Sequence, residues 1–315
     1  MSTFGANKII TEHIKSTDLH AYFVGFDLDD SGNSLYRVKP LIELLTNVIP
    51  EFAFGHHYGT SVDINEIVCK LIESAKSIYN VEAFKKARDL SLSDTDIDDS
   101  DATDDEKKIL KRGEFGELIL HLLLRDFHET IPLVSKIYFK DAENVAVHGF
   151  DAVHIQPDAK SLWLGESKLY QDGKRGVSEL VNDIKEHINR DYLKSEFSII
   201  YRKLNGFDDI PNKTEWLSLL SSSTTLKEQL ESITIPLLCT YSSNVFEKHS
   251  DEKLAEFIKD FENEIKALKA HFDKKNDHAL KDRLNIILLL FPIKCKKELV
   301  KGLHEKLTLM QKLGG

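Results

Sequence analysis

The stretch from Gly149 to His187 decides the fold of this chain: GFDAVHIQPDAKSLWLGESKLYQDGKRGVSELVNDIKEH. Its first half predicts two β-strands, at 147–155 and 162–169, because both segments are rich in β-branched, aromatic and aliphatic residues. The residues QPDAK at 156–160 between them have the composition of a turn. The stretch therefore predicts a β-hairpin that is followed by a helix.

Two charged side chains lie on the otherwise apolar second strand. Glu166 and Lys168 are two residues apart, so they point to the same face of the strand as Leu162 and Leu164. A carboxylate and an ammonium group on an apolar face are costly to bury unless they are paired or bind a ligand. Asp151, near the start of the preceding strand, is expected to lie across the hairpin from them.

Asp151, Glu166 and Lys168 together suit metal-dependent hydrolysis of a phosphodiester. Carboxylates on adjacent strands supply hard oxygen ligands for Mg²⁺. The metal lowers the pKa of a bound water and neutralises charge on the phosphate. A lysine beside it orients or deprotonates that water and stabilises the developing charge. The alternative is an ion pair at a sheet edge with no chemistry, because short Glu-x-Lys strings are common by chance.

Basic residues follow the second strand. We expect a glycine-containing loop at 170–175 and an amphipathic helix from Gly176, whose apolar residues keep the helical spacing. Lys174 and Arg175 stand at the beginning of this helix, where its N-terminus adds donors for a phosphate. Gln171 in the loop is a candidate substrate contact, and a plain surface role explains it equally well.

A long helix is predicted at 105–128, ahead of the hairpin, because its apolar residues repeat with the 3.6-residue period. Glu114 and Glu117 lie near its apolar face. The simplest interpretation is an exposed pair of glutamates bound to Lys111 or His121. Gly113 and Gly116 lower the helix propensity by roughly 1 kcal/mol each, which suggests a close approach of another backbone.

The run DTDIDDSDATDDE at 94–106 holds eight acids in thirteen residues. It is not a calcium loop of the EF-hand type, because Asp99 replaces the required glycine and Asp105 replaces the final glutamate. We interpret the run as a solvated linker. A further hypothesis is that it competes with DNA as a decoy, so that deletion of 94–105 raises DNA binding.

The linker divides the chain into three parts: a small α+β region at 1–93, the linker at 94–106 and the main domain at 107–315. Beyond the hairpin, the main domain has apolar strands at 233–241 and 284–291 and amphipathic helices at 251–272 and 296–312. Three strands in succession followed by alternating helices and strands predict an α/β fold, with one mixed central sheet flanked by helices on both faces.

The composition restricts the class of protein. The 315 residues carry a net charge of −10, which argues against holding nucleic acid by bulk attraction alone, so a nuclease needs a local basic surface or a partner. Three widely spaced cysteines favour a reducing compartment. The sequence shows no signal segment, and no apolar run reaches the roughly 18 residues of a membrane span. These features predict a soluble, cytoplasmic protein without a membrane partner.

The order of elements is similar to the core of the PD-(D/E)xK nucleases. A helix with glutamates, a strand, a strand with Asp151, a strand with Glu166-Ser-Lys168 and an amphipathic helix follow one another. Phe150 stands where the proline is usual, which is a common departure. The resemblance implies a restriction-endonuclease-like core and a metal-dependent deoxyribonuclease.

The same resemblance assigns roles to the acidic and basic residues. It implies that Asp151 and Glu166 bind Mg²⁺ or Mn²⁺, that Lys168 is the catalytic lysine, and that Glu117 (or Glu114) is a further metal ligand.

More narrowly, the runs GEFGELILHLLL, GFDAVHI and LWLGESKLY resemble the HamA family, the nuclease effector subunits of Hachiman anti-phage defence. The likeness is best over 107–310. It implies DNA as the substrate and a heterodimer with the helicase HamB, which would hold the nuclease inactive until infection. Such a partner fits the acidic charge, because it supplies the grip on DNA.

Two other classes of function compete with a nuclease. A non-catalytic regulatory or DNA-positioning subunit would keep the fold and bind a helicase, but would be free to lose Asp151, Glu166 or Lys168. A stand-alone metabolic enzyme is disfavoured, because the sequence has no Gly-x-Ser-x-Gly and no Gly-x-Gly-x-x-Gly.

Overall fold

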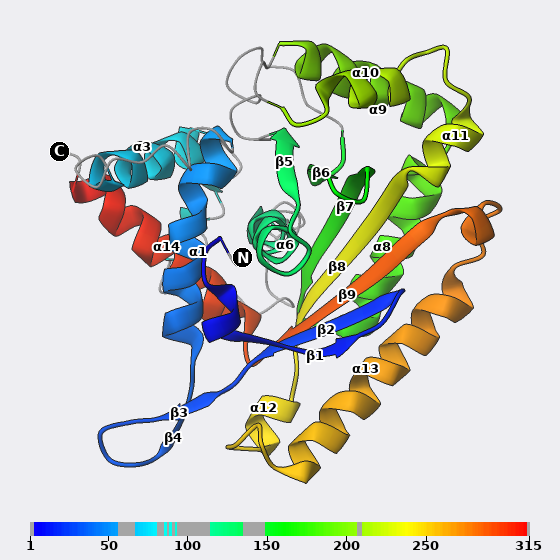
Figure 1. Ribbon diagram of the computed structural model, residues 1–315. Helices are drawn as coiled ribbons and strands as arrows, with labels where there is room; N and C mark the ends of the chain where they lie inside the picture. The colour runs from blue at the N-terminus through cyan, green and yellow to red at the C-terminus, as the bar shows by residue number, and fades with distance from the viewer. Residues whose placement is uncertain are drawn as a thin grey trace.

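The computed structural model describes residues 3–55, 67–80, 114–134, 149–206 and 210–313, with a few positions between 85 and 92. Within these residues, seven strands form one mixed sheet in the order β1-β2-β9-β8-β7-β6-β5, and helices lie on both faces (Figure 1). The predicted α/β fold with a mixed central sheet is confirmed. The predicted acidic linker at 94–106 lies outside the described residues.

The centre of the sheet is parallel. It consists of β2 (Leu19–Val24), β9 (Asn285–Ile293), β8 (Ile233–Ser242) and β7 (Ser161–Tyr170). The sequences of β8 and β9 are almost continuously apolar, as expected for strands that are buried on both faces.

The predicted three-stranded meander is present at one side of the sheet. There β6 (Ala152–Gln156) pairs antiparallel with β7 and with β5 (Ile131–Val134). β5 begins at Ile131, and the residues after 134 lie outside the described part.

The N-terminal region contributes to the same sheet. β1 (Ile10–Lys15), which the sequence did not predict, pairs antiparallel with β2, and β2 joins the C-terminal strand β9. β2 ends at Val24, and at the next residue, Gly25, the side chain of Glu252 lies so close that an added Cβ would meet it at 2.5 Å. The chain continues there as the small hairpin of β3 (Phe26–Leu28) and β4 (Ser34–Tyr36).

One face of the sheet is covered by α6 (Glu114–Phe127), which packs on β7 and is followed outward by three further helices (Figure 1). These are α1 (Val38–Phe54), α3 (Ile67–Asn80) and α14 (Lys296–Leu313). A buried ion pair joins α1 to α6: Arg125 donates to both carboxylate oxygens of Glu51, at 2.6 and 3.2 Å. The His121 ring also contacts Glu51, at 3.0 Å.

The opposite face carries α8 (Gly173–His187), which packs on β7 and β8, and α13 (Ala255–Lys275) beside it. The prediction of a loop at 170–175 is wrong at its C-terminal boundary, because α8 begins at Gly173. The carboxylate of Asp172 accepts a hydrogen bond of 2.7 Å from the backbone N–H of Arg175 and so caps the helix three residues earlier than Gly176.

The remaining helices lie at the two ends of the sheet. α9 (Arg190–Asn205), α10 (Lys213–Leu219) and α11 (Leu226–Glu231) lie at the end where β7 begins, and α12 (Val245–Lys248) lies at the other (Figure 1). Two short 3₁₀ turns complete the described chain, at Ala6–Lys8 and Lys281–Arg283. Among the described residues no helix has both the length and the apolar composition to cross a membrane.

Candidate functional site

The alternation predicted for β7 is present and places Glu166 and Lys168 on the face that α8 covers. Asp151 precedes β6, and the register between Ala152 and Gly165 puts it beside Glu166 across the hairpin. The carboxylate Oδ2 of Asp151 accepts hydrogen bonds of 2.9 Å from the backbone N–H and the hydroxyl of Ser167. The three residues predicted from the sequence are therefore brought together.

Helix α8 adds two side chains that the sequence did not single out. The Nδ1 atom of His187 lies 2.6 Å from Oε1 of Glu166, and the ammonium of Lys168 lies 2.6 Å from Oδ2 of Asp183. Neither residue is part of the Asp151, Glu166 and Lys168 pattern in the sequence. Their spacing in the sequence could have indicated them: residues four apart lie on the same side of a helix, and Asp183 and His187 both flank the apolar stripe that packs on the sheet. We call the set Asp151, Glu166, Lys168, Asp183 and His187 the carboxylate cluster.

Burial and like charge change the acidity of the cluster. The pKa of Glu166 is raised to about 8, first by burial and then by the neighbouring charge of Asp151, although its contact with His187 acts in the opposite direction. Burial also raises the pKa of Asp183, in spite of Lys168. Such a concentration of buried carboxylates favours the arrival of a cation.

The two basic groups respond to the same carboxylates. Burial by itself would lower the pKa of Lys168, but the attraction of Asp183, Asp151 and Glu166 outweighs it and raises the pKa. The pKa of His187 is raised for the corresponding reason: the contact with Glu166 outweighs burial. Lys168 is therefore a firmly charged ammonium group rather than a free base.

Aromatic rings hold His187 in place. Its ring stacks on that of Tyr192 with 4.5 Å between the centroids, and Phe150 meets it edge-on at 6.0 Å. Phe150, the residue before Asp151, thus contacts the imidazole of the cluster directly. The orientation of the imidazole toward Glu166 follows from these contacts.

Glu117 lies on α6, and this helix packs on the other face of β7. A Cβ added to Gly116 would lie 3.2 Å from the Ser167 hydroxyl, so the group that approaches this glycine closely is a side chain rather than the predicted backbone. The groups that shift the pKa of Glu166 most are Asp151, His187 and Asp183. A role for Glu117 as a metal ligand stays a prediction, and the side chain of Glu114 lies outside the described residues.

The predicted phosphate contacts lie at the far end of α8 from His187. Lys174 and Arg175 are exposed in its first turn, about 18 Å from His187 along the helix at 1.5 Å per residue. The guanidinium of Arg175 lies 5.8 Å from the centre of the Tyr170 ring, and Gln171 accepts a hydrogen bond of 3.2 Å from Ser242. These residues form the border of the site at the C-terminal end of β7.

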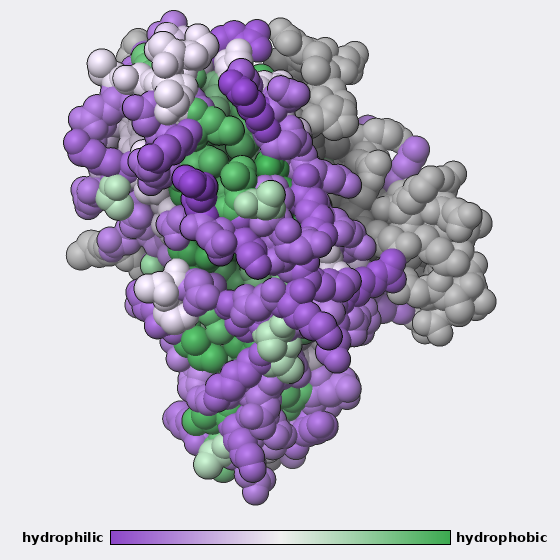
Figure 2. Space-filling model, turned by 90° about the vertical axis from the view of Figure 1, so that its right-hand side faces the viewer, coloured by the Kyte–Doolittle hydropathy of each residue, from purple (hydrophilic) through white to green (hydrophobic). Residues whose placement is uncertain are grey.

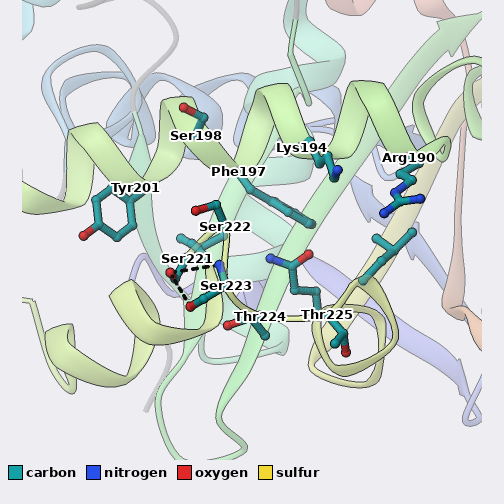
Figure 3. Close-up of a pocket in the computed structure, with 13 residues that line it drawn as sticks. Arg190, Lys194, Phe197, Ser198, Tyr201, Ser221, Ser222, Ser223, Thr224 and Thr225 are labelled. Carbon is teal, nitrogen blue, oxygen red and sulfur yellow. Dashed lines mark hydrogen bonds between the residues drawn. The ribbon is translucent and has the colours of Figure 1, made fainter.

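A pocket of about 620 Å³ lies between α9 and the segment 220–229. Lys194 and Arg190 stand at one end of it and Tyr201 at the other, and the five hydroxyl residues 221–225 contribute to its lining (Figure 3). Figure 2 shows hollowed apolar surface bordered by hydrophilic side chains where α9 and α11 lie in Figure 1. Within the described chain neither Lys194 nor Arg190 has a carboxylate partner, so both charges face the pocket uncompensated. We call this the serine-lined pocket.

A known protein family matches almost the whole chain. The family model of HamA matches residues 4–307. No curated protein matches the chain.

Proposed function

The chain belongs to the HamA family, and we propose that it is a metal-dependent deoxyribonuclease, the effector of a Hachiman anti-phage defence system. Family membership suggests the defence role. The single observation that carries the nuclease proposal is that Asp151, which precedes β6, lies beside Glu166 and Lys168 on the face of β7 that α8 covers. This is the arrangement that the resemblance to PD-(D/E)xK nucleases implies.

The donor set of the carboxylate cluster fits Mg²⁺ or Mn²⁺. Asp151 and Glu166 offer hard oxygen ligands, and Asp183 lies close enough to raise the pKa of Glu166 by its charge. The bound ion would supply a water of lowered pKa and neutralise charge on the phosphate. Burial first, and then the charge of Asp151, raises the pKa of Glu166 to about 8, and a cation bound beside the ionised carboxylate would offset both effects.

The protein's own residues would prepare this chemistry. Ser167 orients the carboxylate of Asp151 through two hydrogen bonds to its Oδ2 atom. Glu166, whose pKa is raised to about 8, must be ionised, and its contact with His187 must give way, before its carboxylate can bind a metal. Lys168, held by Asp183, is placed to stabilise negative charge on a phosphate and to position the attacking water.

DNA as the substrate is supported by the distribution of charge. The net charge is −10, so DNA must meet local basic groups or a partner. Arg190 and Lys194 in the serine-lined pocket are such groups, and Arg190 begins α9 only three residues after His187. We propose that they contact DNA phosphates, with Lys174 and Arg175 as further contacts.

A helicase partner, HamB, is the remaining part of the proposal. In a heterodimer it would supply most of the grip on DNA and hold the nuclease inactive until infection. The competing function is a non-catalytic subunit that positions DNA for the helicase. It is favoured by one observation, that Glu166 and Lys168 are both engaged by residues of α8.

Plasmid cleavage distinguishes the two functions. We expect supercoiled plasmid to be cut in the presence of Mg²⁺ or Mn²⁺ and HamB with ATP, and to stay intact with a chelator. Glu166→Ala and Lys168→Ala should each reduce cleavage by at least about 100-fold, the size of effect typical for loss of one charge-stabilising group. Glu186→Ala, an exposed glutamate on the same helix as His187, is the matched control and should cleave normally. Cleavage that survives both site substitutions would end the nuclease assignment.

A further inference from the structure

A second group of buried titratable side chains lies apart from the carboxylate cluster. It consists of Glu12 on β1, His20 on β2 and His128, which follows the end of α6. Tyr22 belongs to the same surroundings, because its hydroxyl lies 3.0 Å from Nε2 of His128 and its ring contacts Phe127. This group is therefore on the face of the sheet that α6 covers, whereas Glu166 and Lys168 point to the face under α8. We call Glu12, His20 and His128 the histidine cluster.

The ligand atoms of the histidine cluster are separated by distances similar to those between the ligands of a bound metal ion. One ligand atom from each of the three residues can be chosen so that all lie within 4.8 Å of one another. Nδ1 of His20 is 2.7 Å from Oε1 of Glu12, and the rings of His20 and His128 are 4.7 Å apart. Ligands about 2.0–2.1 Å from a tetrahedral zinc ion are roughly 3.3 Å from each other. Shifts of about 1 Å in side-chain position convert the one arrangement into the other.

The chemistry of the residues selects the class of metal. Two imidazoles and one carboxylate are the ligands of zinc and of other divalent first-row transition metals, whereas Mg²⁺ prefers oxygen alone. Imidazole binds a metal ion through a ring nitrogen that carries no proton, and each histidine of the cluster has two nitrogens that can serve in this way. The His20 and His128 side chains are buried, so a metal here would be shielded from exchange with water.

We propose that Glu12, His20 and His128 bind one divalent transition-metal ion of the zinc class. The ion ties the β1–β2 hairpin to the segment that joins α6 to β5, positions that are more than a hundred residues apart in the chain. Its role is structural, because the site lies on the opposite face of the sheet from the carboxylate cluster. The proposal does not depend on the nuclease assignment.

The test is titration of the metal-free, full-length protein with Co²⁺, followed by Zn²⁺ displacement. We expect one equivalent of Co²⁺ with a visible absorption band of nitrogen ligation, and a rise in the melting temperature on addition of Zn²⁺. His20→Gln and His128→Gln should each weaken Zn²⁺ binding by at least about 10-fold. Glu12→Gln is the smaller change that is used if either histidine variant does not fold.

Two matched controls locate the metal. His13 lies on the same strand as Glu12 and has a carboxylate partner, Glu262, at 3.2 Å, but among the residues that the structure describes it contacts no second histidine, so His13→Gln should bind Co²⁺ normally. His187→Gln removes the imidazole of the carboxylate cluster and should also leave the band unchanged. The proposal is overturned if the wild-type protein binds no Co²⁺ or Zn²⁺, or if the band is lost in His187→Gln and kept in the variants of the histidine cluster.

Discussion

The imidazole of His187 and the carboxylate of Glu166 lie 2.6 Å apart, one on helix α8 and the other at the centre of strand β7. The contact occupies an oxygen that a metal ion would need. One turn earlier on α8, the carboxylate of Asp183 forms an ion pair of 2.6 Å with the ammonium group of Lys168. The candidate catalytic residues are thus held by their own helix, so metal binding must compete with two contacts inside the protein.

Asp151 should determine the affinity for the metal. In Asp151→Asn the amide oxygen can still accept from Ser167, so the fold is kept while the charge is lost. We expect Mg²⁺ or Mn²⁺ binding, measured by calorimetry, to weaken by about 10-fold or more. Asp158→Asn, an exposed residue of the hairpin turn, serves as the control. An unchanged affinity would remove Asp151 from the site.

Stability should fall as the pH rises from 7 to 9. The pKa of Glu166 is about 8 in the folded protein against 4.5 as the ordinary value, and the pKa of His187 is raised as well. The folded state therefore holds more protons than the unfolded state, and the free energy of unfolding decreases as these protons leave, by at most about 1.4 kcal/mol per pH unit and proton.

Urea unfolding at successive pH values measures this slope. Above pH 7 the buried histidines His128 and His304, whose pKa values are lowered to about 3 and about 4, are neutral in both states and do not interfere. Glu166→Gln should flatten the slope in this interval. The affinity for Mg²⁺ should rise over the same interval, because Glu166 binds the metal only as a carboxylate. A slope of equal size in wild type and Glu166→Gln would show that other groups cause it.

Charge reversal in the serine-lined pocket should weaken DNA binding. We expect Arg190→Glu and Lys194→Glu, made in the cleavage-impaired Lys168→Ala protein, to bind a short single strand less tightly. The dependence of log affinity on log salt should become less steep by about one per lost phosphate contact. Fluorescence anisotropy at several salt concentrations measures the affinity for the strand and its dependence on salt. Lys259→Glu, an exposed change on α13, is the control, and an equal loss in this variant would point to overall charge as the cause.

The anchoring of the N-terminal region depends on Glu51. Glu51→Gln leaves the buried guanidinium of Arg125 without its ion pair, and loss of one partner of such a pair costs about 3–5 kcal/mol. Urea denaturation should show a lower free energy of unfolding by this amount. Glu43→Gln, an exposed change on the same helix, should have almost no effect. A loss below about 1 kcal/mol would mean that α1 is held by apolar packing alone.

Much of the site followed from local pattern. Alternation along 162–169 placed Glu166 and Lys168 on one face, and the turn at 156–160 placed Asp151 across from them, because side-chain direction in a hairpin depends on residue parity and turn position. The same local reasoning predicted the three-stranded meander and the apolar strands β8 and β9. It was less successful at boundaries, as at Gly173, where a single cap by Asp172 begins the helix three residues early.

The sequence by itself determined which side chains of the hairpin share a face and which helices have an apolar stripe. Only the tertiary structure decided that α8 returns over β7 so that Asp183 and His187 meet Lys168 and Glu166, and that β1 and β2 join the sheet beside β9. The reason is physical. Spacing along the chain governs contacts within a hairpin or a helix, whereas contacts such as that of His20 with His128 depend on how distant apolar faces pack together.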